Sequence, residues 1–338
     1  MPELRKDPVV GRWVIIATER ARRPGNFVDS SENIFNGKQD CPFCHNKEQV
    51  IYSFKNSAAN HRDWSVLVVP SGAPTLKPYG QCNRTGQGLY DIINGYGAHE
   101  VVIETPDHTA NMADLDVEQI KLVLNTYVIR MNDLEKDIKF KHVFPYKNYG
   151  VVAGGRAIGH SRSQIIAAPV NPMRVKEKMT GAKKYYDFHE RCIYCDLIRQ
   201  EQQFKDRVIV ENDHFIAVTP FAARFLFEVW IIPKRHSCDF AKGVMGVEKE
   251  LASILKDMLT RIKIGLNDPA YNYVIHTAPF RREEDLKKQY KTIEEDYHWH
   301  IELMPRLTRV AGFEKGTGFY ICAVPPEKMA EFLREVEI

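Results

Sequence analysis

Long hydrophobic segments are absent from this 338-residue sequence. No apolar run approaches the roughly 18 residues of a membrane-spanning helix, and residues 1–6 are too polar for the start of a signal peptide. A large net charge is also absent, because 47 Lys and Arg nearly balance 44 Asp and Glu. A nucleic-acid-binding surface normally needs a strong basic excess. We therefore expect a cytoplasmic protein that binds neither a membrane nor nucleic acid.

Compositional signs of disorder are absent as well. Apolar residues make up 44% of the chain and charged residues 27%, which is typical of a globular protein with a packed core. The length suits about two ordinary domains or one large domain built on a duplicated unit. Four of the seven cysteines form two Cys-x-x-Cys pairs, a spacing that suits a metal site as readily as a disulfide. A reducing cytoplasm favours the metal site.

An internal repeat relates residues 41–170 to residues 192–307. Each segment begins with Cys-x-x-Cys, continues through β-rich apolar segments to a strand ending near Pro and His, and adds a helix with 3.6-residue periodicity and two closing strands. We therefore predict an α+β fold with a duplicated unit, mainly antiparallel sheet with flanking helices, whose two sheets join or pack face to face. The units are expected at 1–175 and 176–338, connected by the polar segment 170–190.

The repeat also predicts two metal sites. Each half supplies a Cys-x-x-Cys pair and two histidines in the same order, which is a ligand set typical of a closed, tetrahedral, structural zinc site. A thioredoxin-like redox pair would need a neighbouring parallel unit, which the pattern does not predict. His45 and His99 compete as ligands in the first half. The predicted ligands are Cys41, Cys44, His108 and His160 in the first site and Cys192, Cys195, His236 and His298 in the second.

The sequence resembles the galactose-1-phosphate uridylyltransferase family of the histidine-triad superfamily over nearly its whole length. The matching segments are Leu4 to Pro8 with Trp13, Glu19 to Pro24, Cys41 to Cys44, Thr105 to His108, Lys147 to Gly150, Gln164 and Lys315 to Gly318. Members with a second Cys-x-x-Cys, including nucleotide-sugar phosphorylases, are the most similar. The resemblance implies two histidine-triad units in one subunit, a homodimer, and ping-pong transfer of a nucleoside monophosphate between a nucleotide sugar and a sugar 1-phosphate.

The family's catalytic motif is His-x-His-x-Gln, in which the second histidine attacks the α-phosphorus. Here the segment reads His160-Ser161-Arg162-Ser163-Gln164, so Arg162 takes the place of the nucleophile. A guanidinium stays protonated and has no lone pair to offer, so it forms no covalent intermediate.

Three outcomes remain open for the mechanism. Arg162 stabilises direct transfer between two bound substrates; His300, in the intact His-Trp-His segment of the second half, attacks instead; or the protein binds a nucleotide without catalysis.

The resemblance also implies a set of substrate contacts. Gln164 and Asn148 are expected to contact phosphate, and Arg20 and Arg23 either to lie near nucleotide or sugar phosphates or to be solvated surface arginines. Apart from the resemblance, Ser161 and Ser163 flank the site and are expected to donate to phosphoryl oxygens. A basic, glycine-containing turn is expected to bring backbone amides to an anion. It comprises Lys315, Gly316, Thr317 and Gly318.

The leading hypothesis is a zinc-containing nucleotidyltransferase of galactose or other carbohydrate metabolism. Its expected substrates are UDP-hexose and a hexose 1-phosphate. The alternatives are an adenylyltransferase or nucleotide-sugar phosphorylase that uses an adenine nucleotide with inorganic phosphate, and a non-catalytic nucleotide-binding protein.

Overall fold

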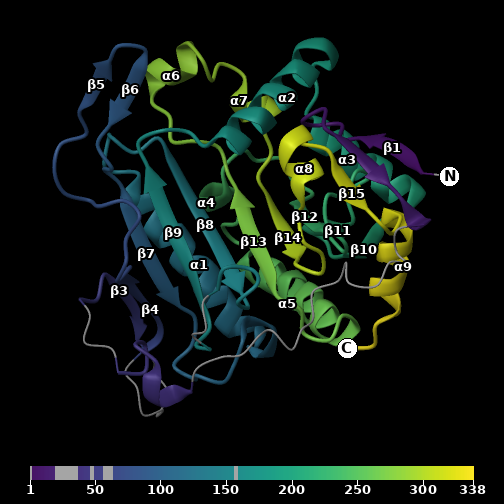
Figure 1. Cartoon of the computed structure of the whole chain (residues 1–338), viewed down its shortest axis with the longest axis horizontal. Coiled ribbons are helices and arrows are strands. Elements are labelled where there is room, and N and C mark those ends of the chain that lie inside the picture. The colour runs from purple at the N-terminus through teal and green to yellow at the C-terminus, as the bar shows by residue number, and fades with distance from the viewer. Residues whose placement is uncertain (1, 20–36, 46–48, 56–63, 156–158) are drawn as a thin grey trace.

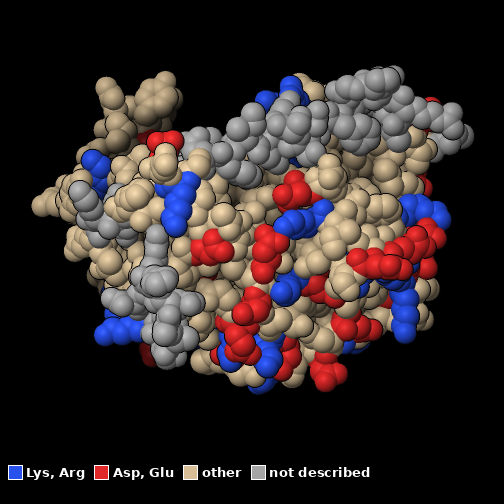
Figure 2. Space-filling view, turned by 90° about the horizontal axis from the view of Figure 1, so that it is seen from below, with Lys and Arg blue, Asp and Glu red and all other residues tan. Residues whose placement is uncertain are grey.

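A computed structural model describes residues 2–19, 37–45, 49–55, 64–155 and 159–338. The predictions for Arg20 and Arg23 concern residues outside these ranges. None of the helices in these ranges has both the length and the apolar composition that a membrane span requires. Basic and acidic side chains are interspersed on the face shown in Figure 2.

A ten-stranded antiparallel sheet forms the centre of the molecule (Figure 1). Its strands, from one edge to the other, are β10 (Val208–Glu211), β11 (Phe215–Val218), β12 (Val229–Pro233), β14 (His300–Pro305), β13 (Tyr271–His276), β8 (His142–Tyr149), β9 (Arg162–Ala168), β7 (Ala98–Ile103), β4 (Trp64–Pro70) and β3 (Tyr52–Lys55).

The strand order shows the predicted duplication. From the outer edge inwards, the first half runs β3, β4, β7, β9, β8, and the second runs β10, β11, β12, β14, β13. The two inner strands, β8 and β13, pair antiparallel in the register Tyr271 with Tyr149 and Val274 with Tyr146. The fold class is therefore confirmed. The two sheets join edge to edge into one, so the face-to-face alternative is wrong.

Two matching helices cover one face of the sheet, which we call the helix face. They are α1 (Val117–Leu134) and α5 (Glu248–Gly265), and they pack against each other. Asp116 starts α1 by accepting a hydrogen bond from the Gln119 amide at 2.7 Å, which satisfies one of the free N–H groups of the first turn. The predicted apolar stripe, which includes Ile120, Leu124 and Met131, is buried in the main core. Burial of this stripe is what holds the helices on the sheet.

The opposite face, which we call the open face, is covered in the second half by α2 (Met173–His189) and α3 (Ile193–Phe204). The segment 170–190, expected to be a polar connection, is therefore mostly helix. The helix was difficult to predict from the sequence, because only Val175, Lys178 and Ala182 are buried and lysine residues occupy much of the solvent-exposed side. The boundary expected after residue 175 falls inside α2, and the division into two units stays a prediction.

A small second sheet connects the two ends of the chain. Strands β1 (Glu3–Lys6) and β2 (Trp13–Ile16) form a hairpin, and β15 (Tyr320–Cys322) pairs parallel with β2. The amino-terminal segment therefore packs with the second half, although the repeat assigned it to the first. The remaining elements are η3 (Lys38–Asp40), β5 (Arg84–Gln87), β6 (Tyr90–Ile93), η4 (Met112–Asp114), α4 (Phe240–Gly243), α6 (Glu283–Lys287), α7 (Ile293–Asp296), α8 (Gly312–Thr317) and α9 (Pro326–Glu335).

His142, at the start of β8, makes the stability of this sheet sensitive to acid. It is 1% exposed, and neither ring nitrogen has a hydrogen-bond partner among the described residues. Burial, with a smaller effect of His276, lowers its pKa to about 3. The unfolded chain takes up this proton below pH about 6.5 and the folded chain does not, so folded-state stability falls between pH about 6.5 and 3.

We therefore expect His142→Leu to reduce this loss. Between pH 7 and pH 5, the free energy of unfolding should fall by about 2 kcal/mol less in the variant than in the wild type. Urea unfolding at both pH values measures the difference, and contributions from other acid-sensitive groups cancel because both proteins contain them. Equal losses in the two proteins would show that His142 is readily protonated in the folded state.

Candidate functional site

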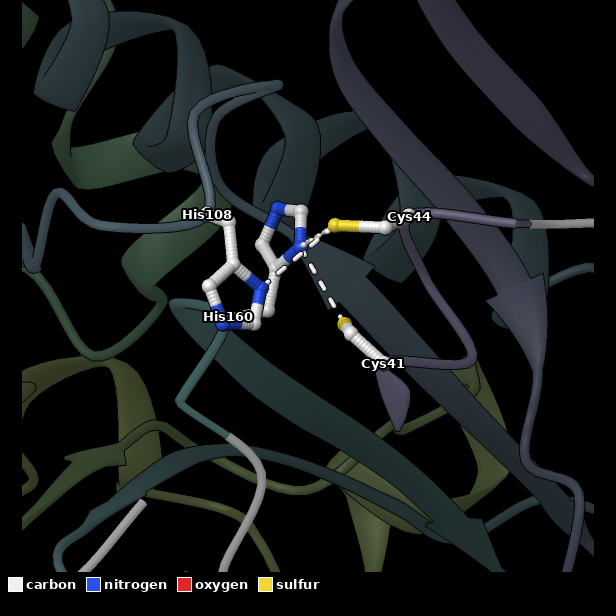
Figure 3. A group of neighbouring side chains, drawn as sticks. All are labelled: Cys41, Cys44, His108 and His160. Atoms are coloured by element: carbon white, nitrogen blue, oxygen red, sulfur yellow. Dashed lines mark hydrogen bonds between the residues drawn. The ribbon is translucent and has the colours of Figure 1, made fainter. Parts of the chain in front are cut away.

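The four predicted ligands of the first half converge (Figure 3). Cys41 and Cys44 lie in a tight turn after η3, in which the Cys44 amide donates to the Cys41 carbonyl at 3.2 Å. Cys44 Sγ lies 3.4 Å from His108 Nδ1, and both sulfurs lie 3.6 Å from His160 Nδ1. All four ligand atoms lie within 4.8 Å of one another.

These distances suit zinc. Zn–S and Zn–N bonds of about 2.3 and 2.0–2.1 Å at a tetrahedral angle place sulfur and nitrogen about 3.6 Å apart. His160 Nε2 lies 2.7 Å from the Thr105 carbonyl oxygen, which fixes Nε2 as the donor and leaves Nδ1 as the acceptor facing the sulfurs. His45 is exposed and outside the group, and His99 makes other contacts.

The second half repeats this arrangement. Cys195 Sγ lies 3.4 Å from His236 Nδ1 and 3.7 Å from His298 Nδ1, while Cys192 Sγ lies 3.8 Å from His298 Nδ1. His298 Nε2 donates to the Pro233 carbonyl at 2.9 Å. Contact with Cys192, followed by contacts with His236 and His298, lowers the pKa of Cys195 far below its usual range. The thiolate is the form that binds a metal.

Side chains alternate between the two faces of the sheet along β9. This alternation places the predicted substrate contacts of this segment in two groups, one on each face. Arg162 and Gln164 are half-buried on the open face. Ser161 and Ser163 are 3% and 1% exposed on the helix face. Ser161 donates to Glu104, and Ser163 accepts from Tyr127 at 2.6 Å. The expectation that the two serines contact substrate therefore needs correction, because both hydroxyls are already engaged in the core.

Gln164 is held in one orientation by His99, which the sequence suggested only as a competing metal ligand, and by Tyr146, which the sequence did not single out. The Thr75 amide donates to His99 Nδ1 at 3.1 Å, so His99 Nε2 carries the proton, and it donates to Gln164 Oε1 at 2.7 Å. Tyr146 donates to the same oxygen at 3.1 Å. With Oε1 satisfied, the side-chain NH₂ of Gln164 is the group that can donate to a ligand. Side chains alternate between the two faces of the sheet along β7 and β8, and this alternation could have predicted that His99 and Tyr146 lie on the same face as Gln164.

The Arg162 side chain is supported on several sides. Its guanidinium donates to the Gly155 carbonyl and to the His160 carbonyl, the latter at 3.2 Å, and lies 5.8 Å from the centre of the Phe43 ring. Phe43 stands between the two cysteines of the first metal group. Gly155 lies where a Cβ would come within 2.8 Å of the Asn148 carbonyl oxygen. The glycine therefore permits a compact loop beside Arg162.

A buried ion pair fixes the backbone beneath Arg162. Lys147 and Glu104 are both about 1% exposed or less, with Nζ and Oε2 2.5 Å apart. Lys147 also donates to Ser161 Oγ at 3.1 Å and to the Arg162 carbonyl at 3.0 Å. Asn148, on the open face, accepts from Asn272 of the neighbouring β13 at 2.8 Å, so the second half helps to position this predicted phosphate contact.

His300 is placed unfavourably for attack on a substrate. It is 0% exposed, and its Nε2 lies 2.7 Å from Lys178 Nζ of α2. Burial, then the charge of Lys178, lowers its pKa well below the usual value.

His276, His300 and Glu302 together resemble a metal group. However, the Lys178 ammonium contacts both His300 and Glu302, so a cation is already present there. This burial argues against His300 as a substitute nucleophile.

Residues 315–318, expected to form a turn, instead end the short helix α8. Gly318 closes it with φ 73°, and its amide donates to the Glu314 carbonyl at 2.9 Å. Thr317 donates to the Phe313 carbonyl within the same helix at 2.7 Å. In Figure 1, α8 lies over the second half of the sheet, away from β9. This chain alone therefore does not bring these residues together with Arg162 and Gln164.

Comparisons with known proteins found relatives that match the whole length of the chain. Family models described as the N-terminal and C-terminal domains of galactose-1-phosphate uridyl transferase match residues 1–172 and 178–331. The chain is 38% identical over 341 residues to ADP-glucose phosphorylase from Arabidopsis thaliana, covering 100% of the chain and 93% of that protein. It is 28% identical over 346 residues to galactose-1-phosphate uridylyltransferase from Thermotoga maritima, covering 100% and 99%. A crystal structure of the Arabidopsis ADP-glucose phosphorylase with bound ADP-glucose superposes with a TM-score of 0.82 at 36% identity, covering 100% of both chains.

Proposed function

Because this chain belongs to the galactose-1-phosphate uridylyltransferase family, we propose that it transfers the nucleoside monophosphate of a nucleotide sugar to a phosphate-bearing acceptor. The observation that supports this most directly is the pair Arg162 and Gln164, two side chains with N–H donors held side by side on the open face of β9. ADP-glucose with inorganic phosphate is the first substrate pair to test, because the Arabidopsis relative carries that name. UDP-glucose with a hexose 1-phosphate is the second.

Transfer on this face proceeds without a covalent enzyme intermediate. An acceptor phosphate oxygen attacks the α-phosphorus, the bond from that phosphorus to the sugar phosphate breaks, and the sugar 1-phosphate leaves with the bonding electrons. Inorganic phosphate then yields a nucleoside diphosphate, and a sugar phosphate yields a new nucleotide sugar. Arg162 and the Gln164 NH₂ donate to the non-bridging oxygens, where negative charge develops in the transition state.

Zinc at both Cys₂His₂ groups is part of this proposal. Each set supplies four ligands and leaves no open position, so the ion would stabilise the fold and take no direct part in transfer. The first site would fix His160, two residues before Arg162, and Phe43, whose ring lies against the guanidinium. The homodimer and the cytoplasmic location also remain proposals. A second copy is needed if Lys315 to Gly318 are to reach the substrate.

A nucleotide-sugar panel tests the proposed reaction. Purified protein is mixed with ADP-glucose or UDP-glucose, with and without phosphate or glucose 1-phosphate, and the products are separated by ion-exchange chromatography. We expect acceptor-dependent formation of nucleoside diphosphate or exchanged nucleotide sugar. Gln164→Glu replaces the donating amide with a carboxylate and should lower kcat by about 10²-fold or more.

An exposed substitution provides the matched control. Gln81→Glu makes the same chemical change on an exposed loop and should leave kcat unchanged. Tight nucleotide binding without turnover of any pair would instead identify a non-catalytic nucleotide-binding protein.

A further inference from the structure

A small cavity opens on the open face, where the two halves meet. Its volume is about 170 Å³, and it lies between the loop after β1, helix α2 and strands β8, β13 and β14. Phe144 and Val274 are among the apolar residues that line it, and Arg12, Arg174 and Arg224 are among the charged ones. We call it the Arg12 pocket.

Most charged groups of the Arg12 pocket already have close partners. Lys178 Nζ lies 2.7 Å from Glu302 Oε1, and Arg224 lies 2.7 Å from Glu302 Oε2 and 2.8 Å from Glu228 Oε1. The Asp7 carboxylate accepts from the amides of the next turn, at 2.9 Å from Val9. These acidic groups are therefore committed to partners within the protein.

Arg12 is the exception. Its side chain is 12% exposed, and its closest carboxylate contact is Glu177 Oε2 at 3.4 Å. That same oxygen lies 2.9 Å from Arg174, so one carboxylate oxygen serves two guanidinium groups. Burial, followed by the charges of Arg224 and Arg174, lowers the pKa of Arg12. The guanidinium also lies 5.7 Å from the centre of the Tyr320 ring. A largely buried cation that shares its one close carboxylate oxygen is still unfavourable unless an anion joins it.

The size of the cavity and the chemistry of its donors define the anion. A volume of about 170 Å³ is below the roughly 300–1,000 Å³ of sites that hold whole drug-sized ligands, so a complete nucleotide sugar does not fit. Guanidinium groups bind tetrahedral oxyanions through paired N–H donors, and the surrounding carboxylates disfavour a second large anionic group. A single phosphate or sulfate group matches both requirements.

We propose that the Arg12 pocket binds one tetrahedral oxyanion, either inorganic phosphate or the phosphate end of a small phosphomonoester, at a site separate from Arg162 and Gln164. The anion joins the loop after β1 to helix α2 and so fixes the amino-terminal hairpin against the second half. Two aromatic rings connect it to the proposed transfer site. Phe144 lines the pocket, its ring centre lies 5.9 Å from that of Tyr146, and Tyr146 contacts Gln164.

Isothermal titration of the 338-residue chain with inorganic phosphate, at constant ionic strength in chloride, tests the proposal. We expect saturable binding that persists in Arg162→Ala and weakens by about tenfold or more in Arg174→Gln, which loses a charged donor. Arg174 is 53% exposed on its side chain, so its replacement should not prevent folding. Arg84→Gln, an exposed arginine on the β5–β6 hairpin, is the control and should bind as the wild type does.

Other outcomes would overturn the proposal. These are the absence of saturable binding, unchanged affinity in Arg174→Gln, or loss of binding in Arg162→Ala. Complete competition by ADP-glucose would assign the phosphate to the transfer site and also contradict a separate pocket. Glycerol 2-phosphate then distinguishes the source: equal affinity identifies a phosphomonoester end group, and much weaker binding identifies the free anion. Failure of turnover in the nucleotide-sugar panel leaves this test unaffected.

Discussion

Arg162→Ala is expected to lower kcat for nucleotidyl transfer by about 10²–10³-fold, the usual effect of removing one charge-stabilising donor from a transition state. The Arg162 guanidinium carries a full positive charge at a position where the family motif has a nucleophile. Its neighbours Gly155 and Phe43 hold it in place, so little reorganisation is needed when charge develops on the phosphoryl oxygens. Steady-state rates with a saturating nucleotide sugar measure the effect.

Arg162→His provides the matched test of mechanism. The wild type should form no covalent adduct, because guanidinium has no lone pair to donate. A neutral imidazole at the same position can attack the α-phosphorus, so the variant should gain one nucleoside monophosphate in intact-mass spectra when acceptor is omitted. An adduct on the wild type would show that another residue attacks. Full activity in Arg162→Ala would show that the guanidinium plays no part in transfer.

Cys192→Ser is expected to lower the zinc content from two ions per chain to one and the melting temperature by roughly 10 °C or more. The second metal group joins three segments that are distant in sequence: the start of α3, the loop containing His236, and His298 before β14. Losing one thiolate weakens all three connections at once. Elemental analysis by plasma mass spectrometry and calorimetry provide the two measurements.

Cys82→Ser is the matched control for this experiment. Cys82 is a half-buried free cysteine outside both ligand groups, so its replacement should leave two zinc ions and change the melting temperature by no more than a few degrees. A folded wild-type protein without zinc, or a Cys192→Ser variant that retains two ions, would contradict the proposed structural role of zinc.

Local pattern and order were sufficient to predict much of the architecture. The repeated Cys-x-x-Cys and histidine spacing identified both ligand groups, because side chains fixed next to strands recur in the same place when the strands recur. The apolar stripe of α1 was equally readable. Helix α2 was not, because most of its surface is lysine-rich and only a narrow stripe containing Val175 and Ala182 is buried.

Contacts between segments that are distant in sequence explain the other features that the sequence did not predict. The pairing of β2 with β15 joins residues that lie about 300 positions apart, and nothing local in either segment indicates the partner. Lys178, which contacts His300, comes from α2, a distant part of the sequence. The intact His-x-His segment therefore did not indicate that His300 is buried. By contrast, the separation of Ser161 and Ser163 from Arg162 was accessible, because strand alternation alone places them on opposite faces.

The pairing of β8 with β13 makes each half of the sheet depend on the other for the hydrogen bonds of its inner strand. A fragment that ended near residue 175 would present β8 as a long, unpaired inner edge, with Tyr146 and Tyr149 deprived of their cross-strand neighbours. Such an edge would capture the same strand of a second fragment, so the truncated chain is prone to self-association. Because both halves lie in one polypeptide, β13 pairs with β8 within the chain, and this pairing protects the protein from dimerising through β8.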